Sequence, residues 1–187
     1  MNTRCLLYRF LILSVALTLP GIALAKDNPK KGEKLEGKVA VITDGDDVIL
    51  LVDKTQYRIR LLGIDAPEES QPFGKQSTKA LSDKILGKTV QVTTYGQDKY
   101  ERILGIIQFD RRNINIEMVK EGFAWHYKQY SDSKVLAKAE EDARKAKVGL
   151  WADENPISPW EWRHPATTED PFDTEEKTQP QLNQQKQ

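Results

Sequence analysis

Cysteine and histidine are nearly absent from this sequence of 187 residues. The one cysteine, Cys5, precedes an apolar run near the N-terminus, and the two histidines, His126 and His164, lie far apart. After residue 25 there is therefore no disulfide, no thiol chemistry and no cysteine ligand of the common zinc sites. Two distant histidines also give no indication of a histidine metal site.

An excess of charge of either sign is missing as well. The formal net charge is zero, and residues 26–165 carry 24 basic and 23 acidic side chains. This balance gives no general electrostatic case for nucleic-acid binding. Any such binding must come from a local cluster of arginine and lysine.

The long apolar run at the N-terminus is too short to span a bilayer comfortably. Phe10–Leu19 follows Arg4 and Arg9 and precedes Ala23-Leu24-Ala25, a small-x-small cleavage site. This pattern predicts a secretory signal peptide at residues 1–25, cleaved after Ala25. The protein is then expected to be secreted or periplasmic, without a membrane anchor.

The rest of the chain has the length of one domain. We expect a flexible lead-in at 26–35, one folded domain at 36–165, and a disordered acidic and glutamine-rich tail at 166–187. Strands are predicted at 38–43, 48–52, 56–64, 89–94 and 103–109, and helices at 72–86, 115–121 (with Asn115 as N-cap) and 133–147. Five strands with a helix after the third predict an α+β protein with a mainly β core, a five-stranded oligonucleotide/oligosaccharide-binding (OB) barrel. A plain α+β domain is the alternative.

Residues 57–68 carry the densest group of reactive side chains. Arg60 lies on the predicted third strand, and Asp65 and Glu68 lie in the turn after it. Arg60 and Asp65 have opposite parity, so a straight strand would place them on opposite faces. Only a bend or bulge at Gly63 brings them together. For this stretch alone, an edge strand with solvated charges is an equal alternative.

A second turn adds Asp46, which can meet Asp65 if the first three strands form a meander. Clustered carboxylates repel one another, and a divalent cation with oxygen ligands is a common solution. Glu68 would then orient or deprotonate a water molecule, and Arg60 and Arg102 would donate to a phosphate.

Other nearby residues are given structural interpretations first. Four carboxylates are predicted to be solvated turn charges: Asp47, Asp53, Glu69 and Asp98. Trp125 and Tyr127 are candidates for stacking on a nucleotide base, with packing at the barrel edge an equal alternative for Trp125. His126 is predicted to lie at the surface. Three tryptophans are expected to anchor the C-terminal segment: Trp151, Trp160 and Trp162.

Taken in order, these motifs resemble the micrococcal nuclease (thermonuclease) family. They are Asp44-Gly45-Asp46, Arg60-Leu61-Leu62-Gly63-Ile64-Asp65-Ala66-Pro67-Glu68 and Asp98-Lys99-Tyr100-Glu101-Arg102. The likeness continues through 121–125 to 149–151 and covers about 36–163. It implies a five-stranded barrel with three helices. It also implies a calcium-dependent phosphodiesterase that cuts DNA and RNA, single-stranded or frayed, to 3′-phosphate ends.

The resemblance also implies a role for each matching residue. Asp46, Asp65 and the Ala66 carbonyl would bind Ca²⁺. Glu68 would be the general base or position the water, and Arg60 and Arg102 would bind the phosphate. Tyr127 would lie near the nucleotide, with Trp125 as a further contact. A monomer without a stable protein partner is expected.

Three departures from the family pattern stand out. Ala66 replaces a threonine, the loop Glu69–Pro72 is shorter, and Glu101 replaces a glycine. A non-catalytic nucleic-acid-binding barrel is the alternative function, and a structural calcium-binding domain is a weaker one. The presence of all five side chains (Asp46, Arg60, Asp65, Glu68 and Arg102) favours the enzyme.

Overall fold

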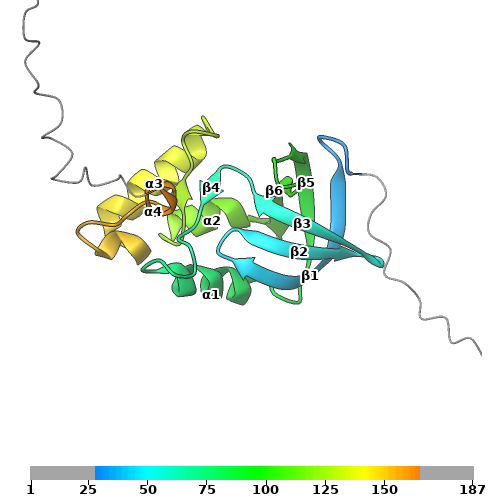
Figure 1. Cartoon of the computed structure of the whole chain (residues 1–187), viewed down its shortest axis with the longest axis horizontal. Coiled ribbons are helices and arrows are strands. Elements are labelled where there is room, and N and C mark those ends of the chain that lie inside the picture. The colour runs from blue at the N-terminus through cyan, green and yellow to red at the C-terminus, as the bar shows by residue number, and fades with distance from the viewer. Residues whose placement is uncertain (1–27, 165–187) are drawn as a thin grey trace, which may run out of the picture.

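Five strands close into a barrel in the computed structural model, which describes residues 28–164. The strands are β1 (Lys34–Asp44), β2 (Asp47–Val52), β3 (Thr55–Leu61), β5 (Thr89–Gln97) and β6 (Ile103–Phe109). They pair in the order β3-β2-β1-β5-β6, and a parallel pairing of β3 with β6 closes the ring (Figure 1). The predicted five-stranded barrel is confirmed. The predicted signal peptide at 1–25 and the tail at 166–187 lie outside the described residues.

Alternating side chains explain why these segments form one barrel. Along β1, β3 and β5, buried residues alternate with more exposed ones, which is the pattern of strands with one face on a core. The buried positions are aliphatic: Leu35, Val39, Val48, Leu50, Ile59, Leu61, Val90, Val92, Ile103 and Ile107. The barrel interior is therefore filled by side chains rather than open to a ligand.

The barrel begins earlier than the sequence indicated. β1 starts at Lys34, and the residues before it are already held: Gly32 N donates to Thr94 O at 2.7 Å, and Thr94 Oγ1 donates to Lys30 O at 2.6 Å. The part of the expected lead-in that the structure describes is thus attached to β5.

Three two-residue strands complete the sheets. β7 (Arg112–Asn113) pairs with β6, and β4 (Ile64–Asp65) pairs with β8 (Trp125–His126). The predicted third strand, 56–64, is thus divided into β3 and β4. The division falls at Gly63, whose φ of 78° is a conformation that glycine adopts readily.

Residues 28–164 contain four α-helices, where the sequence and the family resemblance predicted three. They are α1 (Gly74–Ile85), α2 (Ile114–Lys120), α3 (Lys134–Ala146) and α4 (Pro159–Arg163), with a 3-10 turn, η1, at Gly149–Ala152. α2, α3 and α4 gather at one end of the barrel (Figure 1). α4 escaped prediction because five residues are too few for a helical period. No helix in this described part of the chain is long and apolar enough to cross a membrane.

The prediction that Asn115 caps α2 was wrong. The cap is Asn113, whose side chain accepts from Ile116 N at 3.1 Å. Asn115 lies inside the helix and is buried, where its amide accepts from Ile107 N and donates to Leu62 O and Gly105 O. It therefore ties α2 to β6 and to the bend after β3.

Candidate active site

Close packing brings the β1–β2 turn onto the segment after β3. At Gly45, a Cβ atom would lie 2.0 Å from Ser77 Oγ and 2.7 Å from Ala66 Cβ, so only glycine fits. This approach lets Ala66 N donate to Asp46 Oδ2 at 2.6 Å. The expected meeting of Asp46 with the Asp65–Ala66 segment is thereby observed.

Arg60 lies between the two aspartates. Its Nη1 pairs with Asp46 Oδ1, and its Nη2 donates to Asp65 Oδ1 at 2.6 Å. Asp46 and Asp65 are only 2% and 1% exposed. Burial lowers the pKa of Arg60, and the Asp65 and Asp44 carboxylates oppose that shift. The bend at Gly63 thus brings Arg60 and Asp65 together despite their opposite parity, as predicted.

Arg102 is held by a different pair of carboxylates. Its Nε donates to Asp98 Oδ2 at 2.7 Å, and its Nη1 donates to Asp47 Oδ2 at 3.0 Å. Asp98 Oδ1 also accepts from the backbone N of Tyr100 and of Arg102, which shapes the β5–β6 turn. The prediction that Asp47 and Asp98 are solvated turn charges was therefore wrong. Strand pairing sets Asp47 opposite Arg60 and so links the two arginine groups.

Glu101, which replaces a glycine of the family pattern, adopts a φ of 62°, a positive angle that glycine adopts more readily. Glu101 itself is exposed, and Arg102 pairs with Asp98 and Asp47 instead. The Glu101 side chain is therefore not among the ion-pair partners of Arg102.

Glu68 lies at the rim and is joined to the aspartates by an arginine that the sequence analysis missed. Arg163 Nη1 donates to Glu68 Oε1 at 2.5 Å, and its Nη2 donates to Asp65 Oδ2 at 2.8 Å. The result is a continuous chain of ion pairs, Asp46–Arg60–Asp65–Arg163–Glu68. The one sequence signal for Arg163 was its place in a proline- and tryptophan-rich segment with no family motif.

Tyr127 lies beside this chain of ion pairs, whereas Trp125, although its backbone pairs with Asp65, packs its ring into a separate cluster. Tyr127 N donates to Gly63 O at 3.0 Å, and its half-buried ring stacks on Trp160 with the planes 5° apart. Burial raises the pKa of Tyr127, and the Asp65 carboxylate raises it further. Tyr127 therefore lies near the Asp65 carboxylate.

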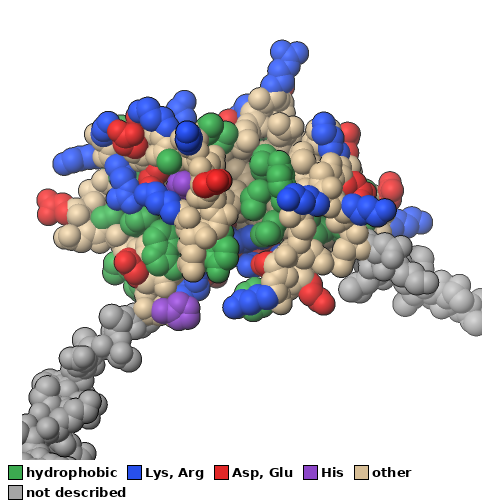
Figure 2. All heavy atoms as spheres, turned by 90° about the horizontal axis from the view of Figure 1, so that it is seen from above, with side chains coloured by type: hydrophobic (Ala, Val, Ile, Leu, Met, Phe, Trp, Pro, Cys, Tyr) green, Lys and Arg blue, Asp and Glu red, His purple; other side chains and the backbone are tan. Residues whose placement is uncertain are grey.

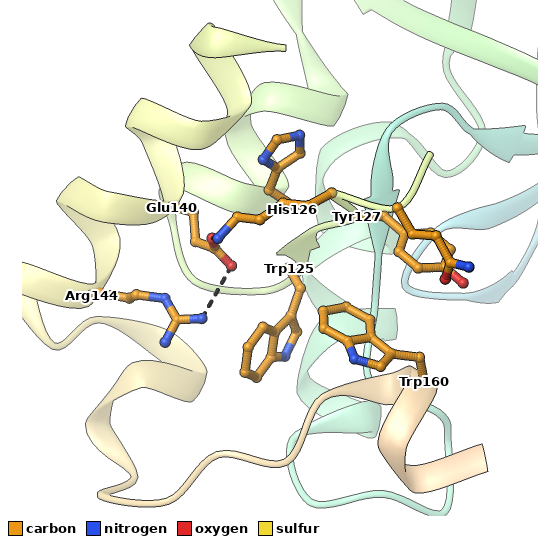
Figure 3. Close-up of a pocket in the computed structure, with 8 residues that line it drawn as sticks. Trp125, His126, Tyr127, Glu140, Arg144 and Trp160 are labelled. Atoms are coloured by element: carbon orange, nitrogen blue, oxygen red, sulfur yellow. Dashed lines mark hydrogen bonds and ion pairs between the residues drawn. The ribbon is translucent and has the colours of Figure 1, made fainter. Parts of the chain in front are cut away.

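Trp125 is 8% exposed and packs within the C-terminal cluster. Its ring lies between the Arg144 guanidinium, 4.7 Å from the ring centre, and Trp160 at 5.4 Å, with Trp151 at 4.5 Å (Figure 3). Of the two alternatives for Trp125, the structure supports packing. The ring also lines a neighbouring cavity, so its contact with a substrate stays a prediction.

Two further predictions about this region were wrong. His126 is buried at 3% exposure rather than at the surface, because β8 pairs it with Ile64, and its Nε2 lies 3.1 Å from Ser131 Oγ. Trp162 is 37% exposed and does not anchor the segment, whereas Trp151 and Trp160 do. A cavity of about 330 Å³ adjoins this cluster, with Tyr127, Glu140 and Trp160 among the residues that line it (Figure 3).

The site carries more negative than positive charge. Six carboxylates gather there (Asp44, Asp46, Asp47, Asp65, Glu68 and Asp98) with four guanidiniums (Arg58, Arg60, Arg102 and Arg163), a formal excess of two negative charges. On the face shown in Figure 2, the two signs are intermixed. A divalent cation would balance the excess at the site.

Comparisons with known proteins agree with this geometry. A sequence profile described as "Staphylococcal nuclease homologue" matches residues 58–153, slightly more than half of the chain. The chain belongs to the staphylococcal nuclease family. The nuclease-family match includes Arg60, Asp65, Glu68 and Arg102, and it ends before α4.

Relatives of this nuclease-family chain occur in bacteria and plants. An "Uncharacterized endonuclease" of Haemophilus influenzae is 46% identical over 132 residues, which are 70% of this chain and 74% of that protein. One of Escherichia coli is 43% identical over 70% of this chain and 86% of its own length. A staphylococcal-like nuclease of Arabidopsis thaliana is 44% identical over 58% of this chain, but over only 33% of its own length.

Proposed function

We propose that this protein is a calcium-dependent endonuclease that hydrolyses DNA and RNA to products with 3′-phosphate ends. Membership of a nuclease family supports the hydrolase class and a nucleic-acid substrate. The observation that carries the assignment is the convergence of Asp46, Arg60, Asp65 and Glu68 in one chain of ion pairs, with Arg102 held alongside. A barrel that only bound nucleic acid would not require this set.

The donor set fits a calcium ion held by few protein ligands. Asp46 and Asp65 converge closely enough for one guanidinium to contact both, and the surrounding charge is negative. Residues 28–164 hold no cluster of three or more His, Cys, Asp or Glu side chains arranged as a metal site. The proposed ligands are therefore limited to two carboxylates and the Ala66 carbonyl, which would make an open site rather than a closed structural cage. When bound, the cation would polarise the phosphoryl oxygen and the attacking water.

The protein groups would act on a phosphodiester as follows. Arg60 and Arg102 donate from two sides to the non-bridging oxygens, whose negative charge grows as water attacks the phosphorus. Glu68, half-exposed at the rim, takes a proton from that water as its oxygen bonds to phosphorus. The P–O5′ bond breaks, O5′ takes up a proton to leave as the 5′-hydroxyl of the other fragment, and the phosphate stays on the 3′ side. Tyr127, next to Asp65, contacts the nucleotide.

The place of action is part of the same proposal. The predicted signal peptide supports secretion or export to the periplasm, and we propose that the mature domain acts there as a monomer. Fractionation of cells that express the full chain, followed by N-terminal sequencing, tests this statement. A mature chain that begins at Lys26 is expected.

The decisive experiment is hydrolysis of single-stranded DNA and RNA by the purified mature domain, with end-group analysis. We expect 3′-phosphate ends with calcium, loss of activity with a chelator, and no activity with magnesium alone, because two carboxylates suit the looser geometry of calcium. Binding of both nucleic acids without cleavage would favour the non-catalytic alternative. Full activity in magnesium after removal of calcium would overturn the calcium requirement.

A further inference from the structure

Residues 157–163, which include α4, contact the site although they lie beyond the end of the family profile match. Residues 157–163 lie after the end of the match at residue 153, yet Arg163 contacts two of the site's carboxylates. Its guanidinium spans Asp65 and Glu68, one a proposed metal ligand and the other the proposed base. A planar fork suits such a bridge, since it presents parallel donors in fixed directions.

Contacts on the N-terminal side of Arg163 hold α4 in place. Ser158 and Glu161 form a capping box at its start, with Pro159 at the first helical position. Trp160 packs against Trp125 and stacks on Tyr127. The capping box and the aromatic packing thus hold the short helix in place, and Arg163 extends from the end of this fixed helix.

The same segment also holds the backbone of Glu68. Gln71 is buried, and its Nε2 donates to Ile157 O at 2.6 Å while its Oε1 accepts from Glu68 N at 3.2 Å. Gln71 N donates in turn to Glu68 O at 2.9 Å. Glu68 is therefore attached to residues 157–163 twice, through its backbone by Gln71 and through its carboxylate by Arg163.

We propose that Arg163 is a positioning residue that holds the Glu68 carboxylate in a fixed place relative to Asp65. Glu68 lies in a turn and is 35% exposed, so without a partner its side chain would sample several rotamers. The rate of a reaction falls when the general base is not held at the position from which it can accept the proton of the attacking water. This inference rests on the proposed function, because Arg163 is inferred to act on the hydrolysis rate by positioning Glu68, the proposed general base.

The first test is steady-state kinetics of Arg163→Met and Arg163→Lys on single-stranded DNA with calcium. The methionine variant keeps an unbranched apolar stem but loses the guanidinium fork, and we expect kcat to fall about tenfold with KM within about twofold. Lysine should recover only part of the rate, since a point charge cannot bridge both carboxylates. Arg112→Met is the matched control, because Arg112 pairs with Glu117 at an exposed position, and its kcat should stay unchanged.

A double-mutant cycle shows whether Arg163 acts through Glu68. In a Glu68→Gln background, Arg163→Met should lower kcat by less than about twofold, because the group that it positions is already gone. An equal loss in both backgrounds would overturn the proposal, as would an unchanged kcat in the single variant. A higher KM with unchanged kcat would assign Arg163 to phosphate binding instead.

Calcium titration by calorimetry, without substrate, gives a readout separate from activity. Arg163→Met should bind calcium as tightly as the wild type or more tightly, because the change frees Asp65 Oδ2. Binding more than about tenfold weaker would overturn the positioning role, since lost metal would then explain the lost rate. If the wild type itself does not cleave DNA with calcium, the proposed function fails rather than this inference alone.

Discussion

Arg60 and Arg102 are expected to bind the same phosphate, but the protein holds them in different ways. Arg60 is nearly enclosed and pairs with Asp46 and Asp65, which are themselves the proposed metal ligands. Arg102 is more exposed and pairs with Asp47 and Asp98, neither of which is expected to bind metal. Arg60 must therefore share its partners with an incoming cation, whereas Arg102 can keep its own.

This difference indicates two roles within one site, preorganisation of a guanidinium at Arg102 and balance of buried charge at Arg60. The Arg102 group is preorganised, because Asp98 fixes the side chain and the turn that carries it. The Arg60 group balances buried negative charge, and the proposed cation would take over part of that role. Removing the Arg60 charge is expected to be strongly destabilising, because the buried carboxylates would then be desolvated without a compensating ion pair.

The largest expected effect is on stability without metal. Arg60→Met leaves two buried carboxylates short of a partner, and we expect the free energy of unfolding in a chelator to fall by about 3–5 kcal/mol. Arg102→Met should cost less, about 1–3 kcal/mol, because Asp98 is partly solvated and the buried Asp47 still has Arg58 at 3.8 Å. Urea unfolding measures both, with Arg112→Met as a surface control. Equal losses for Arg60 and Arg102 would contradict the distinction.

Calcium should then separate the two groups further. At about 100 times its dissociation constant, a ligand stabilises the folded state by about 2.7 kcal/mol. We expect calcium to give Arg102→Met a stabilisation like that of the wild type and to give Arg60→Met a larger one, because the competing guanidinium is gone. Thermal unfolding with calcium and with chelator measures this. Asp65→Asn should lose the response, and a retained response would show that Asp65 is not a ligand.

A smaller effect concerns the pH dependence of the Arg102 group. Burial alone would raise the pKa of Asp98, but hydrogen bonds from Arg102 and from backbone N–H groups outweigh it, and the pKa lies below the usual 3.8. Asp98 therefore contributes stability above pH 3.8 that is lost as the pH falls through its folded-state pKa. The difference in unfolding free energy between wild type and Asp98→Asn should shrink as the pH falls below this value. A constant difference across the acid range would contradict the assignment.

The smallest expected effect is at Glu101. With φ at 62°, a non-glycine residue carries strain of about 1 kcal/mol, and Glu101→Gly should recover up to about that amount. Removing an exposed charge beside the phosphate site should also raise activity modestly, by about two- to fivefold at low salt. Glu101→Gln separates the two effects, since it removes the charge and keeps the strain. Lower activity of the glycine variant at every salt concentration would mean that Glu101 supports Arg102.

The sequence predicted the barrel because its strands alternate cleanly and the turns between them carry glycine and aspartate. It also placed the bend at Gly63, since Arg60 and Asp65 could meet in no other way. It failed where tertiary contacts decide a residue's role. Asp47 and Asp98 looked like ordinary turn charges until strand pairing set them against Arg102, and Arg163 reached the site from a helix too short to show a period.

The parallel pairing of β3 with β6 has a consequence for folding. At this β3–β6 seam, Ile59 pairs with Ile103, which places Arg60 and Arg102 on either side of the same strand pairing. The two strands are separated in sequence by α1 and β5, so this contact is among those that cost the most loop-closure entropy and are expected to form slowly. A chain with an open seam would keep much of its secondary structure yet have its two arginines apart. Closing the barrel and forming the proposed phosphate site are thus a single event, so recovery of activity in a refolding experiment would report on the pairing of β3 with β6.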